Sequence, residues 1–325
     1  MRKLRSYLCG SWEDGLGNGE ALLNPATEDV LAYSSSDGLD RRQALAFARS
    51  VGGPALRGLT FGQRGDLVRK TASLLQMHRD ELILLSMLNG GNTRSDAKFD
   101  VDGAIATLQA FAEVGAAIGD KRLLLDGEAV PLGRAPRFAG QHILTTRHGV
   151  AVHINAFNFP AWGLAEKAAV ALLAGMPVLT KPATSSSLVA HRLVELLVEA
   201  QIWPKGSISL LLGRAGDLVD LLEGQDCLAF TGGASTAALL RQTPGVVMRG
   251  ARINVEADSL NAAVLGPDVE PGTETWDFFL KDVLSELETD PARPLLRGGD
   301  PAQARALQLR GRRPELEPVE QLALR

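Results

Sequence analysis

Residues 150–183 constrain the fold more than any other part of the chain. Residues 150–154 carry an apolar side chain at every second position, which is the pattern of a β-strand that buries one face. Residues 161–174 are apolar around most of a helix circumference, so this helix is expected to be buried. Residues 177–181 then predict a second strand. A strand–helix–strand unit of this length favours a parallel sheet with a right-handed crossover.

The ends of these elements carry turn-forming and polar residues. Asn158 and Pro160 mark the turn into the helix, because proline suits the first helical turn. Gly175 ends the helix. Lys181 stands at the carboxyl end of the second strand, which is the edge at which open α/β sheets bind their ligands.

The same alternation continues to about residue 265. We predict further strands over 207–212, 227–231, 252–256 and 262–265, with helices between them over 184–200, 215–222 and 235–242. Thr184 to Ser187 are expected to cap helix 184–200 with a side chain. No G-x-G-x-x-G motif follows any predicted strand, so the nucleotide-binding outline of the sheet does not by itself establish a function.

The N-terminal segment predicts short antiparallel strands. Residues 4–35 read as β-hairpins, with turns supplied by residues 15–19 and by Asn24-Pro25. The glycines in 15–19 superficially resemble a phosphate-binding loop. A hairpin turn is the better interpretation, because no strand-to-helix context surrounds them.

Residues 37–119 are mostly helical in pattern, and Asp40 can cap the first helix. An apolar stripe at helical spacing falls on Val101, Ile105, Leu108 and Ala112. Residues 121–147 are mixed and partly extended, and residues 275–287 predict one more amphipathic helix. We expect these helices to pack on a sheet.

Composition argues against several classes of protein. The 325 residues are 45% hydrophobic and carry a net charge of −4, so we expect neither a nucleic-acid nor an anionic-membrane partner. The two cysteines are far apart and the five histidines are scattered, which indicates no metal site and a reducing, cytoplasmic setting. The longest apolar run, residues 168–179, is broken by Gly175 and Pro177 and is too short to cross a membrane. We therefore expect a soluble protein.

Residues 288–325 differ from the rest of the chain. They contain five prolines and many arginines but neither lysine nor an aromatic residue. This composition predicts a poorly packed or disordered tail. We expect a folded part over residues 1–287 and a tail over 288–325, which fits an out-of-frame reading of the gene.

Four short motifs follow one another in the alternating region. They are Asn158-Phe-Pro160, Lys181-Pro-Ala183, Phe230-Thr-Gly-Gly233 and Val255-Glu-Ala-Asp-Ser259. Together with Asn24-Pro-Ala-Thr27, this order resembles the aldehyde dehydrogenase superfamily. Segments 54–57, 154–160 and 256–261 are most similar to the aldehyde dehydrogenase domain of the phenylacetate-degradation proteins PaaZ and PaaN, and the related benzoyl-CoA-pathway semialdehyde dehydrogenases share them. The resemblance covers residues from about 4 to about 287.

The resemblance implies the α/β fold of an aldehyde dehydrogenase. Residues 1–287 would form its Rossmann-like cofactor-binding domain with N-terminal β-hairpins and helices, and the catalytic domain would be absent. The family reaction oxidises a CoA-linked semialdehyde to the acid with NAD(P). The implied partners are the nicotinamide cofactor and that aldehyde. Family members form homo-oligomers, which is doubtful for this chain.

The resemblance assigns catalytic roles to two residues. Asn158 matches the donor that stabilises the oxyanion of a tetrahedral thiohemiacetal, a contribution often worth roughly 10²–10³ in rate. From spacing alone, Asn158 equally well caps the helix that starts at Pro160. Glu256 matches the general base that activates the nucleophile or the deacylating water. Without the resemblance, Glu256 reads as a solvated residue at a strand end.

The remaining matched residues bind the cofactor. Lys181 matches the lysine that bonds a ribose, and Ala156 and Phe157 lie in the adjoining turn. Thr184 stands where many NAD-preferring relatives carry a glutamate that would repel a 2′-phosphate, so it favours NADP, with NAD possible. The turns that approach the pyrophosphate and nicotinamide are matched by Gly213, Gly216, Phe230, Thr231, Gly232 and Gly233. Gly233 replaces a serine usual in the family. For Gly213 and Gly216, loop glycines without a ligand remain the alternative to the cofactor role.

The family's nucleophile has no counterpart. Family members carry a Gly-Gln-x-Cys segment about three dozen residues beyond the glutamate, and a thiol there forms the covalent intermediate. Here no cysteine follows Cys227, which reads as a small residue packed in a strand, and Cys9 lies in the N-terminal hairpin. We therefore expect a truncated, inactive member of the family. The alternative is a non-enzymatic protein that binds nucleotide or pairs with an intact paralogue.

Overall fold

The computed structural model of the chain describes residues 2–135, 137–258 and 265–289. The chain divides into two compact units, Met1–Gly266 and Pro267–Arg325. In the second unit, α10 (Glu274–Thr289) confirms the amphipathic helix predicted over 275–287. The strand predicted over 262–265 and the predicted tail lie almost wholly outside the described residues.

A seven-stranded mixed sheet organises the first unit, with strand order β12-β11-β8-β9-β10-β2-β3. Its five parallel strands are β8 (Ala151–Ile154), β9 (Val178–Lys181), β10 (Ile208–Leu210), β11 (Cys227–Gly232) and β12 (Arg252–Ala257). The first of these parallel strands in the sequence is β8. Strands β9 and β10 follow on one side of it, and β11 and β12 then lie on its other side. The strand order therefore reverses between β8 and β11, at a topological switch point where α/β sheets bind ligands.

Two antiparallel strands extend this sheet beyond β10. They are β2 (Ser6–Leu8) and β3 (Ser11–Glu13), and Tyr7 of β2 pairs with Leu210 of β10. The N-terminal hairpin therefore joins the sheet that carries the predicted site. The side chain of Ser6 fixes this junction by accepting a hydrogen bond from the Leu212 N–H at 3.0 Å.

A separate three-stranded sheet contains β1 (Lys3–Leu4), β4 (Glu20–Leu23) and β5 (Val30–Ser34). The predicted hairpin turn at Asn24-Pro25 is confirmed, because it joins the antiparallel pair β4 and β5. The predicted hairpin turn at residues 15–19 is wrong, since it links β3 to β4 across two sheets. The Lys3 ammonium holds this loop by donating to the Gly15 and Gly17 carbonyls.

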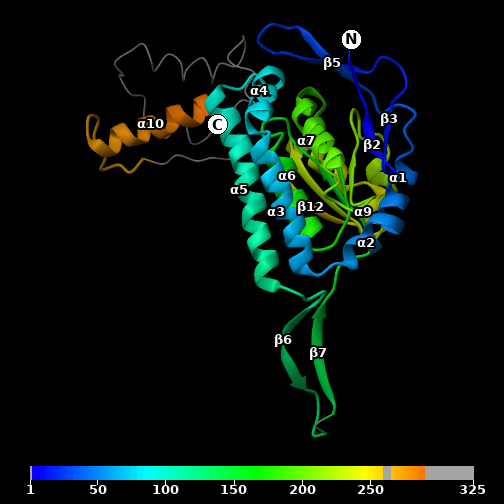
Figure 1. Cartoon of the computed structure of the whole chain (residues 1–325). Helices are drawn as coiled ribbons and strands as arrows, with labels where there is room; N and C mark the ends of the chain where they lie inside the picture. The colour runs from blue at the N-terminus through cyan, green and yellow to red at the C-terminus, as the bar shows by residue number, and fades with distance from the viewer. Residues whose placement is uncertain (1, 136, 259–264, 290–325) are drawn as a thin grey trace. The chain divides into compact units, whose positions relative to one another are not determined.

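Helices cover both faces of the large sheet (Figure 1). On one face lie α2 (Gly53–Arg57), α3 (Phe61–Met77), α4 (Arg79–Gly90), α5 (Arg94–Ile118), α6 (Trp162–Leu173) and α7 (Ser187–Glu199). On the other lie α1 (Arg41–Phe47), the π-helical turn η1 (Ala48–Gly52), η3 (Leu218–Leu221), α8 (Ala234–Arg241) and α9 (Pro244–Val247). The alternation in β8 explains both layers, because Ala151 packs in the first core and Val152 in the second.

Helix α5 carries the predicted apolar stripe, and all four of its residues are buried. By length and composition alone, α5 could also cross a membrane. Its buried face packs against α3 and α6, so α5 is a core helix of the first unit. Charged residues interrupt the segment, and for that reason it does not stand out in the sequence as an apolar run.

Two local helix predictions differ from the structure. Residues 215–222 form only the 3₁₀ turn η3, because Gly216 in a left-handed conformation and Leu222 in an extended one leave room for a single turn. The predicted side-chain cap from Thr184 to Ser187 is also wrong. These residues form the 3₁₀ turn η2 (Thr184–Ser186), and Asn89 of α4 instead accepts from the Leu188 N–H at 3.2 Å. The cap predicted at Asp40 is confirmed.

The predicted extended region is a long two-stranded hairpin of β6 (Leu124–Pro131) and β7 (Ala139–Leu144). It projects away from the other elements of the first unit (Figure 1). Exposed apolar residues lie on both of its strands.

Candidate cofactor-binding site

The carboxyl ends of the parallel strands bring the predicted site residues to one edge of the sheet. Ile154, at the end of β8, pairs with Lys181 of β9 on one side and with Phe230 of β11 on the other. Thr231 of β11 in turn pairs with Glu256 of β12. The sheet register thus places Ile154 and Glu256, which are 102 positions apart in the sequence, on the same four consecutive strands.

Asn158 lies in the turn that follows β8 and is half-buried. Its amide makes no hydrogen bond within the described residues. The interpretation of Asn158 as the helix cap is wrong, because α6 begins at Trp162 and receives its cap from another element. The side chain of Asn158 is therefore available to a ligand at the switch point.

The cap of α6 is Asp100, a fully buried residue of α5. Its carboxylate accepts from the backbone N–H groups of Ala161 at 3.1 Å and Trp162 at 2.8 Å. Burial raises the pKa of Asp100 from 3.8 to about 6, and the two N–H donors oppose this rise. Asp100 thus fixes the helix that directly follows the Asn158 turn.

The same face of α5 holds the ring of Trp162. Thr107 accepts a hydrogen bond from the indole N–H of Trp162 at 2.9 Å. At Gly103 a Cβ atom would stand only 2.3 Å from the Trp162 ring, so glycine is required for this contact. The start of α6 therefore packs against one face of α5, on which Asp100, Gly103 and Thr107 lie three and four positions apart.

The carboxyl end of α6 is held by a second buried ion, Arg64 of α3. Its guanidinium donates to the carbonyls of Leu173 at 2.7 Å, Leu56 at 3.1 Å and Leu59 at 2.6 Å. Burial lowers the pKa of Arg64 to about 10. A carboxylate at the N-terminus and a cation at the C-terminus both complement the dipole of α6.

Lys181 ends β9, and Thr184 begins the η2 turn that follows it. The Lys181 ammonium makes no hydrogen bond within the described residues, and burial lowers its pKa while the charge of Glu20 opposes this shift. The Thr184 hydroxyl donates to the carbonyl of Gly213 at 3.3 Å. Gly213 adopts a φ of +82°, and a Cβ there would lie 2.8 Å from the Ser36 nitrogen. The loops after β9 and β10 are therefore in contact.

Residues Phe230 to Gly232 end β11, and Gly233 joins the strand to α8. A Cβ at Gly232 would lie 2.6 Å from the Phe230 ring, whereas a Cβ at Gly233 would meet no heavy atom closer than 4.0 Å. Gly233 therefore leaves its backbone open to a ligand at the start of α8. The first N–H of that helix, on Ala234, donates to the carboxylate of Asp258 at 3.0 Å.

Glu256 is exposed, and its carboxylate accepts a hydrogen bond from the Thr231 hydroxyl at 3.1 Å. This bond joins the predicted general base to a predicted cofactor residue on the neighbouring strand. An exposed carboxylate held by one hydroxyl is free to accept a proton from a water molecule.

Neither cysteine lies at this edge. Cys227 begins β11, at the opposite end of the strand from Gly232, and packs against the core. Burial raises the pKa of its thiol. Cys9 lies in the turn between β2 and β3, where burial and the charges of Glu13 and Asp40 also raise the pKa of the thiol. Neither environment favours a thiolate nucleophile.

The residues at the edge fit a nicotinamide dinucleotide in most respects. A lysine without a partner among the described residues, an open glycine turn and a helix N-terminus suit a ribose and a pyrophosphate, and the Asn158 amide adjoins them. The carboxylate of Asp258 is the exception, because it places negative charge where the pyrophosphate is expected.

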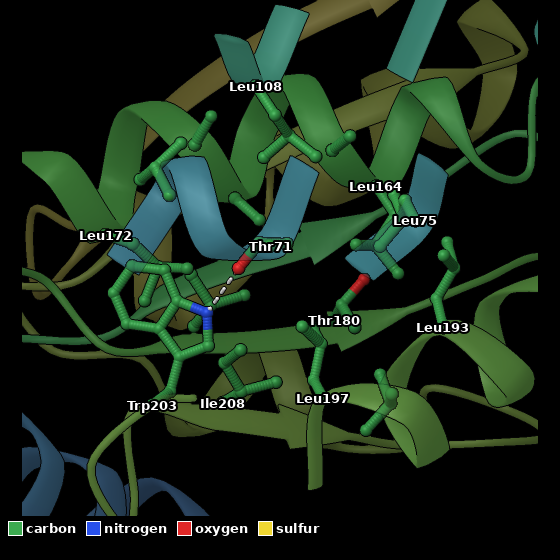
Figure 2. A pocket seen from close by; sticks show the side chains of 16 residues that line it. Thr71, Leu75, Leu108, Leu164, Leu172, Thr180, Leu193, Leu197, Trp203 and Ile208 are labelled. Carbon is green, nitrogen blue, oxygen red and sulfur yellow. Dashed lines mark hydrogen bonds between the residues drawn. The ribbon is translucent and has the colours of Figure 1, made fainter. Parts of the chain in front are cut away.

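An apolar cavity on the α6 side of the sheet is not this site. Figure 2 shows its lining, with the indole of Trp203 bonded to the Thr71 hydroxyl at 3.0 Å. The cavity holds about 30 Å³, the volume of a single water, whereas sites for organic ligands occupy about 300–1,000 Å³. It is a packing gap in the core.

The sequence prediction missed two acidic residues of the site. Asp100 falls on the buried stripe of α5 between Ala97 and Ala104, so a carboxylate on an apolar face was the signal. Asp258 lies within the motif 255–259, but the sequence gave no signal of its contact with α8, because that contact depends on the pairing of β11 with β12.

Comparison with known proteins agrees with this geometry. Residues 12–273 match the aldehyde dehydrogenase family. A 3,4-dehydroadipyl-CoA semialdehyde dehydrogenase from Aromatoleum evansii is 50% identical over 285 residues, which cover 88% of this chain and 55% of that protein. Succinate-semialdehyde dehydrogenase [NADP(+)] GabD of Escherichia coli is 31% identical over 70% of this chain and 46% of its own length. The chain thus spans about half the length of these relatives.

A solved structure shows the same fold. Betaine aldehyde dehydrogenase from Staphylococcus aureus, in complex with NAD+, superposes with a TM-score of 0.68 at 26% identity, over 78% of this chain and 49% of that one. The architecture is the predicted α/β, Rossmann-like portion of an aldehyde dehydrogenase fold. By the match over residues 12–273 and by this fold, the chain belongs to the aldehyde dehydrogenase family.

Proposed function

We propose that this chain is the cofactor-binding part of an NADP-dependent dehydrogenase that oxidises a CoA-linked semialdehyde in the cytoplasmic breakdown of aromatic compounds, of the PaaZ/PaaN or benzoyl-CoA-pathway type. The relative from Aromatoleum evansii, at 50% identity, supports the substrate class by its name. Members of the family use NAD or NADP. The neutral Thr184 in the ribose loop favours NADP, because it does not repel a 2′-phosphate.

One structural observation carries the proposal. The free amide of Asn158, the unbonded ammonium of Lys181 and the exposed carboxylate of Glu256 share the carboxyl edge of one parallel sheet at its switch point. Lone residues of these types are common on protein surfaces. Their convergence at this edge is the arrangement expected of a dinucleotide site with adjoining chemistry.

Each residue then has a distinct role. Lys181 and Thr184 bind the adenosine ribose, and the turns at Gly213, Gly216 and Phe230 to Gly233 bring backbone close to the dinucleotide. A bound nicotinamide supplies the hydride acceptor. Where a thiol is supplied to this edge, Asn158 would donate a hydrogen bond to the oxyanion that the thiol's attack creates, and Asp100 holds α6, the helix after its turn, in place. Glu256 would then accept the proton of the hydrolytic water.

The 325-residue chain has no thiol at this edge, so we propose that it binds the cofactor but does not turn over an aldehyde alone. Calorimetric titration with NADP and with NAD, combined with an assay of NADPH and NADH formation from a CoA-linked semialdehyde, tests both parts. We expect binding without turnover. Turnover above background would refute the inactivity, and no heat with either dinucleotide would refute the cofactor site.

The second candidate function is pairing with another protein copy. The exposed apolar residues of the β6–β7 hairpin favour it, since such a surface is usually covered in an assembly. This role is compatible with cofactor binding in the same chain.

A further inference from the structure

An ion pair lies at the edge of the proposed ribose site. Arg214, just after β10, donates to the carboxylate of Glu20 at 2.7 Å. Glu20 begins β4, and β4 packs against the η2 turn that contains Thr184. The charge of Glu20 also acts on Lys181 at the end of β9. One carboxylate therefore influences two cations from neighbouring strand ends.

The backbone of Arg214 is fixed whereas its side chain is free. The Arg41 guanidinium donates to the carbonyls of Ser36 at 3.2 Å and Arg214 at 3.4 Å. The Arg214 side chain itself is 82% exposed, and that of Glu20 is 44% exposed. Exposed ion pairs of this kind contribute little to stability. The guanidinium can therefore leave Glu20 for a better ligand at small cost.

A phosphate is such a ligand. A guanidinium binds phosphate oxygens through two parallel N–H donors, and such charge-assisted bonds are among the strongest in proteins. Thr184 connects the two loops by its bond to Gly213, the residue before Arg214. A 2′-phosphate on a ribose held by Lys181 would lie beside this junction. The acidic groups acting on Arg214 are Glu20, which accepts its hydrogen bond, and Asp37, while Asp217 pairs with Arg41.

We propose that Arg214 determines the preference for NADP: its guanidinium leaves Glu20 and, together with Lys181, binds the 2′-phosphate, and Glu20 occupies that position when no phosphate is bound. This inference rests on the proposed cofactor site. The neutral Thr184 does not repel the 2′-phosphate, whereas Arg214 attracts and binds it. Glu20 is then a competitor of the phosphate.

The test uses the full chain and two pairs of ligands in calorimetric titrations. Adenosine 2′,5′-bisphosphate against 5′-AMP isolates the 2′-phosphate, and NADP against NAD reports the whole cofactor. The variants are Arg214→Ser and Glu20→Gln. Arg69→Ser and Glu113→Gln are matched controls, since they form an exposed pair at 3.4 Å between α3 and α5, remote from the strand ends.

We expect Arg214→Ser to weaken binding of the bisphosphate and of NADP about tenfold or more, with 5′-AMP and NAD within about threefold of the parent chain. We expect Glu20→Gln to strengthen bisphosphate binding about two- to fivefold, because the competing charge is gone. The controls should change neither ratio. If Arg214→Ser leaves the NADP-to-NAD ratio unchanged while both dinucleotides bind, this inference fails and the proposed function stands. If neither dinucleotide binds, the proposed function fails with it.

Discussion

Asp100 is a carboxylate whose burial and hydrogen bonds act in opposite directions. Two backbone N–H groups at the start of α6 favour its ionised form, and complete burial disfavours it. Burial prevails, so the pKa in the folded chain is about 6 against an ordinary value of 3.8. Between these two pH values, the folded state holds a proton that the unfolded state has released. Stability from this group therefore rises as the pH falls from about 6 to about 4.

The substitution Asp100→Asn tests this assignment. Asparagine keeps one oxygen to accept from the α6 N-terminus but cannot titrate. We expect the unfolding free energy of the parent chain to rise relative to the variant by roughly 2–3 kcal/mol between pH 7 and pH 4, the linkage expected for about two pKa units. Urea unfolding across this pH range measures it. Asp66→Asn, at an exposed position on α3, is the control, and parallel pH profiles for parent and Asp100→Asn would contradict the raised pKa.

At the scale of elements, the N-terminus of α8 is placed to interact with two negatively charged groups, the Asp258 carboxylate and a bound pyrophosphate. Its first N–H bonds the Asp258 carboxylate, and its preceding turn at Gly233 is open for a dinucleotide. A helix N-terminus favours negative charge, so Asp258 and a pyrophosphate compete for the same field. Asp258 has a φ of +55°, a conformation that asparagine also tolerates.

The substitution Asp258→Asn should therefore strengthen cofactor binding. The amide oxygen retains the cap on Ala234 and the repelling charge is lost. We expect the affinities for NADP and NAD to rise together by about three- to tenfold, in contrast to Glu20→Gln, which should favour NADP alone. Calorimetric titration with each dinucleotide measures both. Equal or weaker affinity for both would show that the carboxylate does not face the pyrophosphate.

The sequence predicted the elements whose signals are local. Strands β8 and β9 and the helix between them follow from alternation and from Gly175, and their ends placed Lys181 correctly at the carboxyl edge. The helix caps that the sequence did not predict depend on contacts between segments that are distant in the chain. The cap of α6 comes from a residue 61 positions before Ala161, and the cap of α7 comes from Asn89. Such partners become visible only when the helices pack together.

At the scale of the whole molecule, the stability of the β6–β7 hairpin needs an explanation, because its two strands pair, among the described strands, only with each other and carry exposed apolar side chains. An isolated two-stranded hairpin is at best marginally stable in water. Here Leu125 and Ile143 stand directly opposite each other, and they are 63% and 51% exposed. A pair of apolar side chains at this position is stabilising when another surface covers it. A second copy of the chain is the partner that we expect.

The double substitution Leu125→Thr, Ile143→Thr should weaken self-association. Threonine keeps the preference for β-structure, so the hairpin itself is retained while the apolar contact is lost. Because burial of each such side chain contributes about 1.5–3 kcal/mol, the dissociation constant should rise at least roughly tenfold. Sedimentation velocity over a range of concentrations measures this. Met77→Gln is the control, since Met77 is an apolar residue on α3 that is 74% exposed, more than either hairpin residue. A parent chain that stays monomeric at every concentration, or a double variant that associates as the parent does, would show that copies of this chain do not cover the hairpin.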